Sequence, residues 1–499
     1  MIPQRWCGWG DCGRSAAQVI GDCLLCDGHF CRIHRQKPWH QCPAPEEDWE
    51  SYSAQYGSAE TRDIDALCRQ IDSTKLCSRA SLLRGGIPCT VELSRQHLSS
   101  MMGGQNCHVE VTFQDNVKWL ARFRVTTTTS PPQDVRDWIL RSEVATMNFL
   151  QTQTSILTPR VFDWACESDP KNPVGVGYIL MEKLDGRPLD WGEANPHQRE
   201  KVIQQLVNIF LEIEKHPFDA MGSLILSAGN TTELQGLANP STFRVGEGPL
   251  GPFSSCIDGI QSLLGSYLEM IASGEIDTCC PLDTYLVHRF RLDILDALWE
   301  DVRTDGPFFL KHPDDKGDHI LVNDTFDIVG LIDWEWTETV PKAQAFCSPC
   351  MMWPVAEFYK GSNMLTADEL RLAEVFRDKG REDLANCVIN GRKAQRFFFG
   401  LGTDASYVNT QTFLSLFAGL QEAFCSGNEE WENWKAEALE RWKSDGLITR
   451  LLGQSETRNK ILTCKGNCPR DYEVKLDNVS ITGGITLIGK EESMESDAE

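Results

Sequence analysis

Eight cysteine and histidine side chains lie within the first 42 residues at spacings that suit zinc. They are Cys7, Cys12, Cys23, Cys26, Cys31, His34, His40 and Cys42. Zinc takes four thiolate or imidazole ligands, so eight ligands predict two tetrahedral sites. A segment of about 42 residues cannot build a sufficient core, so metal binding would supply its folding free energy. The alternative is an unstructured cysteine-rich leader.

The second half of this segment resembles the AN1-type zinc finger. The matching residues are Phe30, Cys31, His34, Arg35, His40 and Cys42. The resemblance implies interleaved sites, with Cys7, Cys12, Cys31 and His34 on one zinc ion and Cys23, Cys26, His40 and Cys42 on the other. The gap of four residues between Cys7 and Cys12 is longer than the family's usual two. The resemblance also implies a structural role, and such fingers are often linked to ubiquitin and stress pathways.

A second set of residues, in the segment 308–336, has the chemistry of phosphoryl transfer. That reaction needs one carboxylate to orient or deprotonate the acceptor and another to hold the magnesium ion that bridges the phosphates. A predicted hairpin over 320–334 has Asp314 before it and Asp333 at its end. We expect Asp314 to face the acceptor hydroxyl and Asp333 to face the metal. A chance His-x-Asp in an acid-rich chain is the alternative.

This segment resembles the aminoglycoside phosphotransferase and choline kinase-like family, and most closely its fungal branch, over roughly residues 80–430. The matching residues are His312, Asp314, Ile320, Leu321, Val322, Ile332, Asp333 and Trp334. The resemblance implies ATP and magnesium as cofactors. The family's asparagine, its second magnesium ligand, is replaced by His319, and histidine is a poor ligand for a hard cation. Asp318 is the candidate substitute.

Other parts of a nucleotide site follow in the family's order upstream. Gly103–Gly104 precedes a strand, as a nucleotide-covering loop would, although a plain turn is the alternative. Arg122 stands where the family has its phosphate-binding lysine, and Arg124 is its rival because both could point to one face. Glu143 is expected to pair with this cation, unless it is a solvated helix residue. Glu182 lies where the hinge to the adenine would be.

The elements that must position these residues predict an α+β, bilobal protein-kinase-like fold after the finger. Alternating apolar residues predict a hairpin over 108–123, and 3.6-residue periodicity predicts a helix over 135–150. Helical periodicity dominates after residue 196. The expected organisation is a finger over 1–44, an acidic linker over 45–70, an N-terminal lobe over 71–186, a helical C-terminal lobe over 187–455 and a mobile acidic tail over 456–499.

The composition restricts the partners. The 499 residues include 72 acidic and 48 basic ones, a net charge of −24, which repels nucleic acid and anionic membranes from most of the surface. No apolar run approaches the roughly 18 residues of a membrane span, and the first residues lack the apolar core of a signal peptide. We therefore expect a cytoplasmic protein, with the nucleus not excluded, that binds neither nucleic acid nor membranes.

Two functions remain open from the sequence. The first is an ATP-dependent enzyme that phosphorylates a hydroxyl of a small-molecule acceptor. The second is a binding module in which the finger docks a protein partner and the kinase-like domain is weakly active or inactive. Asp314 and Asp333 favour the first, and His319 with the incomplete glycine loop favours the second.

Overall fold

The computed structural model describes most of the chain. The described residues are 4–18, 20–45, 47–100, 102–227, 229, 231–243, 247–276, 278, 280–298, 306–401, 410–425, 427 and 429–453. The predicted acidic tail over 456–499 lies outside them. Within these ranges, no helix is both long enough and apolar enough to cross a membrane.

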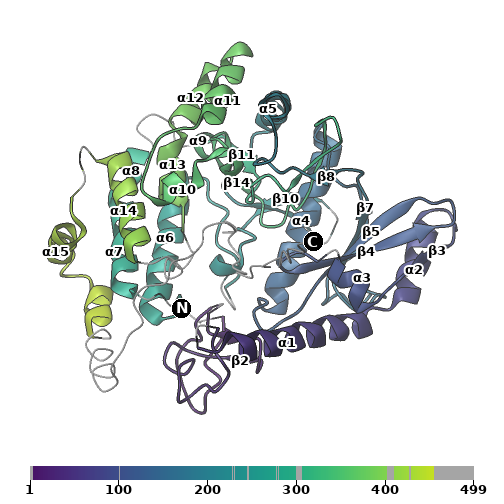
Figure 1. Cartoon of the computed structure of the whole chain (residues 1–499), viewed down its shortest axis with the longest axis horizontal. Helices are drawn as coiled ribbons and strands as arrows, with labels where there is room; N and C mark the ends of the chain where they lie inside the picture. Colours follow the sequence, from purple (N-terminus) through teal and green to yellow (C-terminus); the bar gives the residue numbers. More distant parts are fainter. Residues whose placement is uncertain are drawn as a thin grey trace, which may run out of the picture.

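The N-terminal lobe is built on a five-stranded antiparallel sheet with the order β3-β4-β5-β7-β6 (Figure 1). Its strands are β3 (Cys89–Val91), β4 (Asn106–Phe113), β5 (Lys118–Arg124), β6 (Val161–Ala165) and β7 (Tyr178–Glu182). Buried and partly buried residues alternate along β4, as expected for a strand with one face on a core. The predicted hairpin is therefore confirmed, and Asn116 occupies the left-handed region in its turn.

Helix α4 (Gln133–Gln153) follows β5, as the periodicity predicts. Its buried face includes Val135, Ile139 and Glu143. Apolar residues of α4 and β7 share one core cluster with residues of α5 (Pro196–Glu214) and β12 (Ile320–Val322), which belong to the C-terminal lobe. The two lobes are thus joined by packing as well as by the chain.

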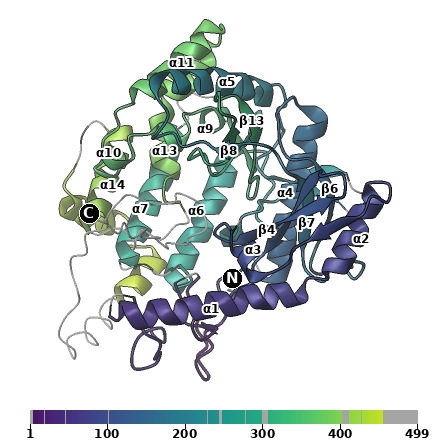
Figure 2. The ribbon, with the colours of Figure 1, turned by 45° about the vertical axis from the view of Figure 1, so that its right-hand side comes forward.

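The region expected to be an acidic linker, 45–70, is mostly a helix, and this corrects the prediction of its structure. Helix α1 (Trp49–Gln70) has 22 residues, and the side chain of Asp48 caps its N-terminus by accepting from the amide of Ser51. Ile64 and Leu67 are buried in the core of the N-terminal lobe, where α1 lies beside the strands (Figure 2). Packing of this apolar stripe stabilises a helix whose acidic, polar composition is typical of a linker.

Two short helices complete this lobe. They are α2 (Ser73–Leu83) and α3 (Arg95–Ser100). Helix α3 lies in the connection between β3 and β4.

The C-terminal lobe is mainly helical, as predicted. Its helices are α5, α6 (Cys256–Ser273), α7 (Pro281–Asp293), α8 (Leu295–Leu298), α9 (Lys342–Ala345), α10 (Val355–Tyr359), α11 (Ala367–Asp378), α12 (Glu382–Ile389), α13 (Gly391–Phe398), α14 (Thr410–Phe424) and α15 (Trp431–Arg441). Short strands form a three-stranded sheet of β13 (Ile328–Leu331), β12 and β8 (Arg187–Pro188), and the pairs β9 (Ser223–Leu226) with β10 (Thr232–Gln235) and β11 (Phe308–Lys311) with β14 (Glu338–Pro341). The predicted α+β organisation, with a sheet-rich N-terminal lobe and a helical C-terminal lobe, is confirmed.

The N-terminal finger, which contains β1 (Asp22–Cys23) and β2 (Gly28–His29), contacts both lobes. Arg5 donates to the backbone carbonyls of Thr128 (2.7 Å) and Ser130, in the loop before α4. On the other side, the side chain and backbone amide of Gln18 donate to Glu275 at 2.7 and 2.8 Å, at the end of α6. The finger therefore bridges the two lobes, whereas the boundaries of the domains stay predictions.

Candidate functional site

The structure brings the eight predicted zinc ligands together in two groups. One group is Cys7, Cys12, Cys31 and His34, and the other is Cys23, Cys26, His40 and Cys42; within each group the ligand atoms lie within 4.8 Å of one another. These are the two interleaved sets that the AN1 resemblance implies.

The geometry of both groups fits zinc. Sγ of Cys7 lies 3.3 Å from Nδ1 of His34, and Sγ of Cys26 lies 3.5 Å from Nε2 of His40. Zinc bonds sulfur at about 2.3 Å and imidazole nitrogen at about 2.0 Å, so the edges of a tetrahedron measure roughly 3.5–3.8 Å. The ligands in the second half of the finger, Cys31, His34, His40 and Cys42, are separated by short gaps along the chain. Thiolate and imidazole are the donors that zinc prefers.

The second candidate centre lies on the loop between β11 and β12, and His312 organises it. His312 Nε2 donates to the carbonyl of Ile332 at 3.0 Å, while its Nδ1 accepts from the amide of Asp314 at 3.2 Å. One buried imidazole thus ties the loop with Asp314 to the end of β13, next to Asp333. Burial lowers the pKa of His312, which keeps the ring neutral and able to do both. Gly317, at φ 115, allows the sharp turn that follows.

Asp314 has the properties of a general base. Burial raises its pKa to about 6, against an ordinary value of 3.8, although the ammonium of Lys316 lies 3.0 Å away and opposes the shift. Its Oδ1 is buried and has no hydrogen-bond partner among the described residues. A carboxylate with one free oxygen and a pKa near neutrality can accept a proton from a hydroxyl placed against it.

His319 and Asp318 point in different directions. The His319 ring is 7% exposed and stacks on His312 with centroids 4.2 Å apart, and burial holds its pKa well below the ordinary range. Its Nδ1 is buried without a partner in the described part of the chain. Asp318, by contrast, is 54% exposed and lies 3.3 Å from Lys316. Of these two residues, only Asp318 has an exposed oxygen donor, as expected from the sequence for a substitute ligand.

Asp333 is exposed at the end of β13 and has an unusual backbone. Its side chain is 56% exposed, and its Oδ1 lies 3.8 Å from Nη2 of Arg122. Its φ of 62° lies in the left-handed region, which non-glycine residues adopt rarely. The next residue, Trp334, is buried and donates to Thr158 at 2.9 Å, which fixes the turn. An accessible carboxylate on a fixed turn is suited to bind a cation.

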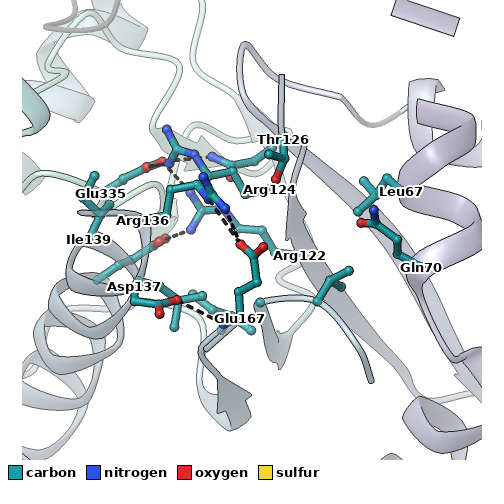
Figure 3. Close-up of a pocket in the computed structure, with 16 residues that line it drawn as sticks. Leu67, Gln70, Arg122, Arg124, Thr126, Arg136, Asp137, Ile139, Glu167 and Glu335 are labelled. Carbon is teal, nitrogen blue, oxygen red and sulfur yellow. Dashed lines mark hydrogen bonds and ion pairs between the residues drawn. The ribbon is translucent and has the colours of Figure 1, made fainter. Parts of the chain in front are cut away.

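The predicted phosphate-binding cation, Arg122, is buried in an ion cluster. Arg122 Nη1 donates to Glu143 of α4, and its Nη2 donates to Glu335 at 2.7 Å. Arg124 Nη1 also donates to Glu335. Figure 3 shows Arg122, Arg124 and Glu335 directed toward one another in a pocket that residues of β4, β5, α4 and the end of α1 line. We call Arg122, Arg124, Glu143 and Glu335 the inter-lobe ion cluster, because Glu335 alone comes from the C-terminal lobe.

The remaining predicted residues lie at the edges of the N-terminal lobe. Gly103 and Gly104 form a turn before β4, closed by the hydrogen bond from the Gly103 amide to the Asn106 carbonyl at 2.8 Å. Glu182 ends β7, and its carboxylate accepts from the amide of Arg160 at 3.2 Å. Their roles toward a nucleotide stay predictions.

Sequence reasoning missed Glu335 and Lys316. Glu335 lies 213 residues from Arg122 in the chain, so no local pattern reveals the pair. The available signal was a single acid between Trp334 and Trp336, directly after the predicted metal ligand. Lys316 was visible only as a basic residue among acids, and its contact with Asp314 at 3.0 Å is a feature of the folded loop.

Comparisons with known proteins cover this chain unevenly. No protein-family model matches it. A subtelomeric hrmA-associated cluster protein of Aspergillus fumigatus is 36% identical over 85 residues, which are 17% of this chain and 16% of that protein. Altered inheritance of mitochondria protein 9 of Candida glabrata is 32% identical over 105 residues, 17% of this chain and 16% of that protein. The chain thus matches about a sixth of the length of these curated relatives.

Several solved structures are similar in overall fold. Plasmodium vivax ethanolamine kinase has a TM-score of 0.38 at 14% identity, covering 71% of this chain and 81% of that one. A thermostable mutant of the aminoglycoside phosphotransferase APH(4)-Ia has a TM-score of 0.36 at 14% identity, covering 69% of this chain and 98% of that one. The chemistry of the site must therefore be inferred from the residues of this chain.

Proposed function

We propose that the chain is an ATP- and magnesium-dependent phosphotransferase that acts on a hydroxyl of a small molecule, preceded by an AN1-type finger with two structural zinc ions. The observation that supports this most is the pair of hydrogen bonds made by His312. They hold Asp314, whose pKa is raised to about 6, next to the turn that carries the accessible Asp333. A cytoplasmic location belongs to the same proposal.

Each residue has one task in this proposal. Asp314 accepts the proton of the acceptor hydroxyl through its free Oδ1, and Lys316 holds the other oxygen in place. Asp333 and Asp318 would hold magnesium, which when bound neutralises charge on the phosphates. The Arg122–Glu143 ion pair lies across from them on the N-terminal lobe.

The experiment is calorimetry with ATP, in the presence and absence of magnesium, together with a turnover screen against an acceptor library. Asp333→Asn should weaken the binding of magnesium-ATP but not of metal-free ATP. Asp314→Asn should leave binding intact and lower turnover by on the order of 10²-fold or more. Parallel loss of binding in both variants would contradict the separate tasks.

A second function is favoured by His319 and by the inter-lobe ion cluster, in which the arginines already donate to carboxylates. The proposal is a weakly catalytic or non-catalytic binding module whose finger docks a protein partner. His319→Asn distinguishes the two, because restoring an oxygen donor should raise magnesium affinity in an enzyme. A parent protein that binds no nucleotide would favour the binding module.

A further inference from the structure

Glu335 is a carboxylate of the C-terminal lobe that is held entirely by donors of the N-terminal lobe. Only 5% of it is exposed. Its Oε2 accepts from Arg122 at 2.7 Å and from Asn106 at 2.9 Å, and its Oε1 accepts from Arg124. Burial favours the neutral form of Glu335, but the charges of Arg124 and Arg122 outweigh burial and lower its pKa.

The same contacts occupy both terminal guanidinium nitrogens of each arginine. Arg122 donates from one terminal nitrogen to Glu143 and from the other to Glu335. Arg124 donates from one to Glu335 and from the other to Gln105. Two guanidinium charges thus meet the buried carboxylates of Glu143 and Glu335 in a low-dielectric place, where such pairs interact strongly, and the exposed Asp333 lies 3.8 Å from Arg122. A phosphate that approached Arg122 here would find its charge already matched and would meet a carboxylate.

We propose that Glu335 is an internal competitor for the phosphates of the ligand, so that a polyphosphate binds Arg122 and Arg124 only when Glu335 leaves them. The proposal rests on the proposed function in one respect, namely that the phosphates are those of a nucleotide. It adds a regulatory consequence: because Glu335 belongs to the other lobe, phosphate binding must break a contact between the lobes. Nucleotide affinity is then set by this exchange.

Movement of Glu335 away from the arginines must disturb the turn that Trp334 fixes. Asp333 and Trp336 flank it, and both have a φ of 62°, in the left-handed region that non-glycine residues rarely adopt. Trp336 packs against the cluster of Val135, Ile139 and Phe243, beside α4. A shift of the turn would therefore change the packing of Trp336 against α4, the helix that carries Glu143.

The test is binding of metal-free tripolyphosphate by calorimetry to the full zinc-loaded chain. Glu335→Gln keeps the shape of the side chain and removes its charge, so we expect binding at least about tenfold tighter than in the parent. Glu110→Gln is the matched control, because Glu110 lies on β4 and pairs with Lys118 and Lys183, outside the cluster. It should change the affinity by less than about twofold. Affinity that is unchanged or weaker in Glu335→Gln would overturn the proposal.

A second measurement uses the parent alone and decides the matter even if Glu335→Gln fails to fold. Hydrogen exchange of the amides of residues 335–337 should become faster at saturating tripolyphosphate, because the turn is released. Amide hydrogen exchange that stays unchanged or becomes slower at every tripolyphosphate concentration would refute the replacement of Glu335 by phosphate on the arginines. Failure of the proposed function looks different: Asp333→Asn would keep its full affinity for magnesium-ATP while the tripolyphosphate comparison still held.

Discussion

The burial of Asp314 predicts how the stability of the protein depends on pH. Folding raises its pKa from 3.8 to about 6. Burial is the main cause of this rise, and the attraction of Lys316 opposes it. A carboxyl group with a raised pKa is penalised when it ionises, so the penalty is absent well below pH about 4, grows between pH 4 and 6 and is complete above pH 6. The difference in pKa corresponds to about 3 kcal/mol of unfolding free energy.

The perturbation that isolates this effect is Asp314→Asn, which cannot ionise. Urea unfolding of the parent and the variant from pH 4 to pH 7.5 gives the difference in their free energies of unfolding at each pH. Relative to the parent, the variant should gain about 2.4 kcal/mol between the two ends of this range, because part of the penalty is already present at pH 4. Effects of pH on the zinc ligands are common to both proteins and cancel in the difference.

Asp324→Asn is the control, because Asp324 is an exposed carboxylate in the turn of the β12–β13 hairpin and no burial penalty is removed there. A difference between parent and Asp314→Asn that stays constant with pH would refute the assignment of a raised pKa. The same assignment requires turnover, once an acceptor is known, to rise through pH about 6 and to level off above it, because only the ionised carboxylate accepts a proton.

Three further predictions concern the finger and the core. Elemental analysis should return two zinc ions per chain. Cys31→Ala should lower this number and unfold the finger, as removal of zinc by a chelator would, whereas Cys68→Ala should leave the zinc content unchanged. Arg5→Ala should keep both zinc ions but speed hydrogen exchange in the loop before α4, at a cost of about 1.5–3 kcal/mol for its lost charged hydrogen bonds. Arg392→Ala should lower the free energy of unfolding by about 3–5 kcal/mol, measured by urea unfolding, because it leaves the fully buried carboxylate of Glu369 without its counter-ion.

The sequence predicted those features that local periodicity and spacing encode. The β4–β5 hairpin, α4 and the two zinc-ligand groups follow from alternation, from the 3.6-residue period and from short gaps between ligands. Helix α1 was missed because its composition is that of a linker. Asp48 at the N-cap, and Ile64, Leu67 and Ile71 at helical spacing, were the signals that could have revealed it.

The candidate site was predictable in its residues but not in its contacts. Asp314 and Asp333 could be named from their places around a hairpin, whereas the raised pKa of Asp314 depends on burial by distant segments. The docking of the finger on both lobes was equally hidden, since Arg5 and Gln18 reach partners that lie more than 100 residues away in the chain. Interactions of this kind depend on the tertiary fold and leave no mark in a window of 20 residues.

Arginine at position 122 and glutamate at position 335 are best understood together. A guanidinium has a rigid fork, so its two ends can donate to two carboxylates on different elements, here Glu143 of α4 and Glu335 of the other lobe. The ammonium of a lysine is a compact point charge and lacks this geometry. The arginine at position 122 is thus the residue that allows the inter-lobe ion cluster to form. In the proposed competition, the arginine–glutamate contact and an arginine–phosphate contact exclude each other.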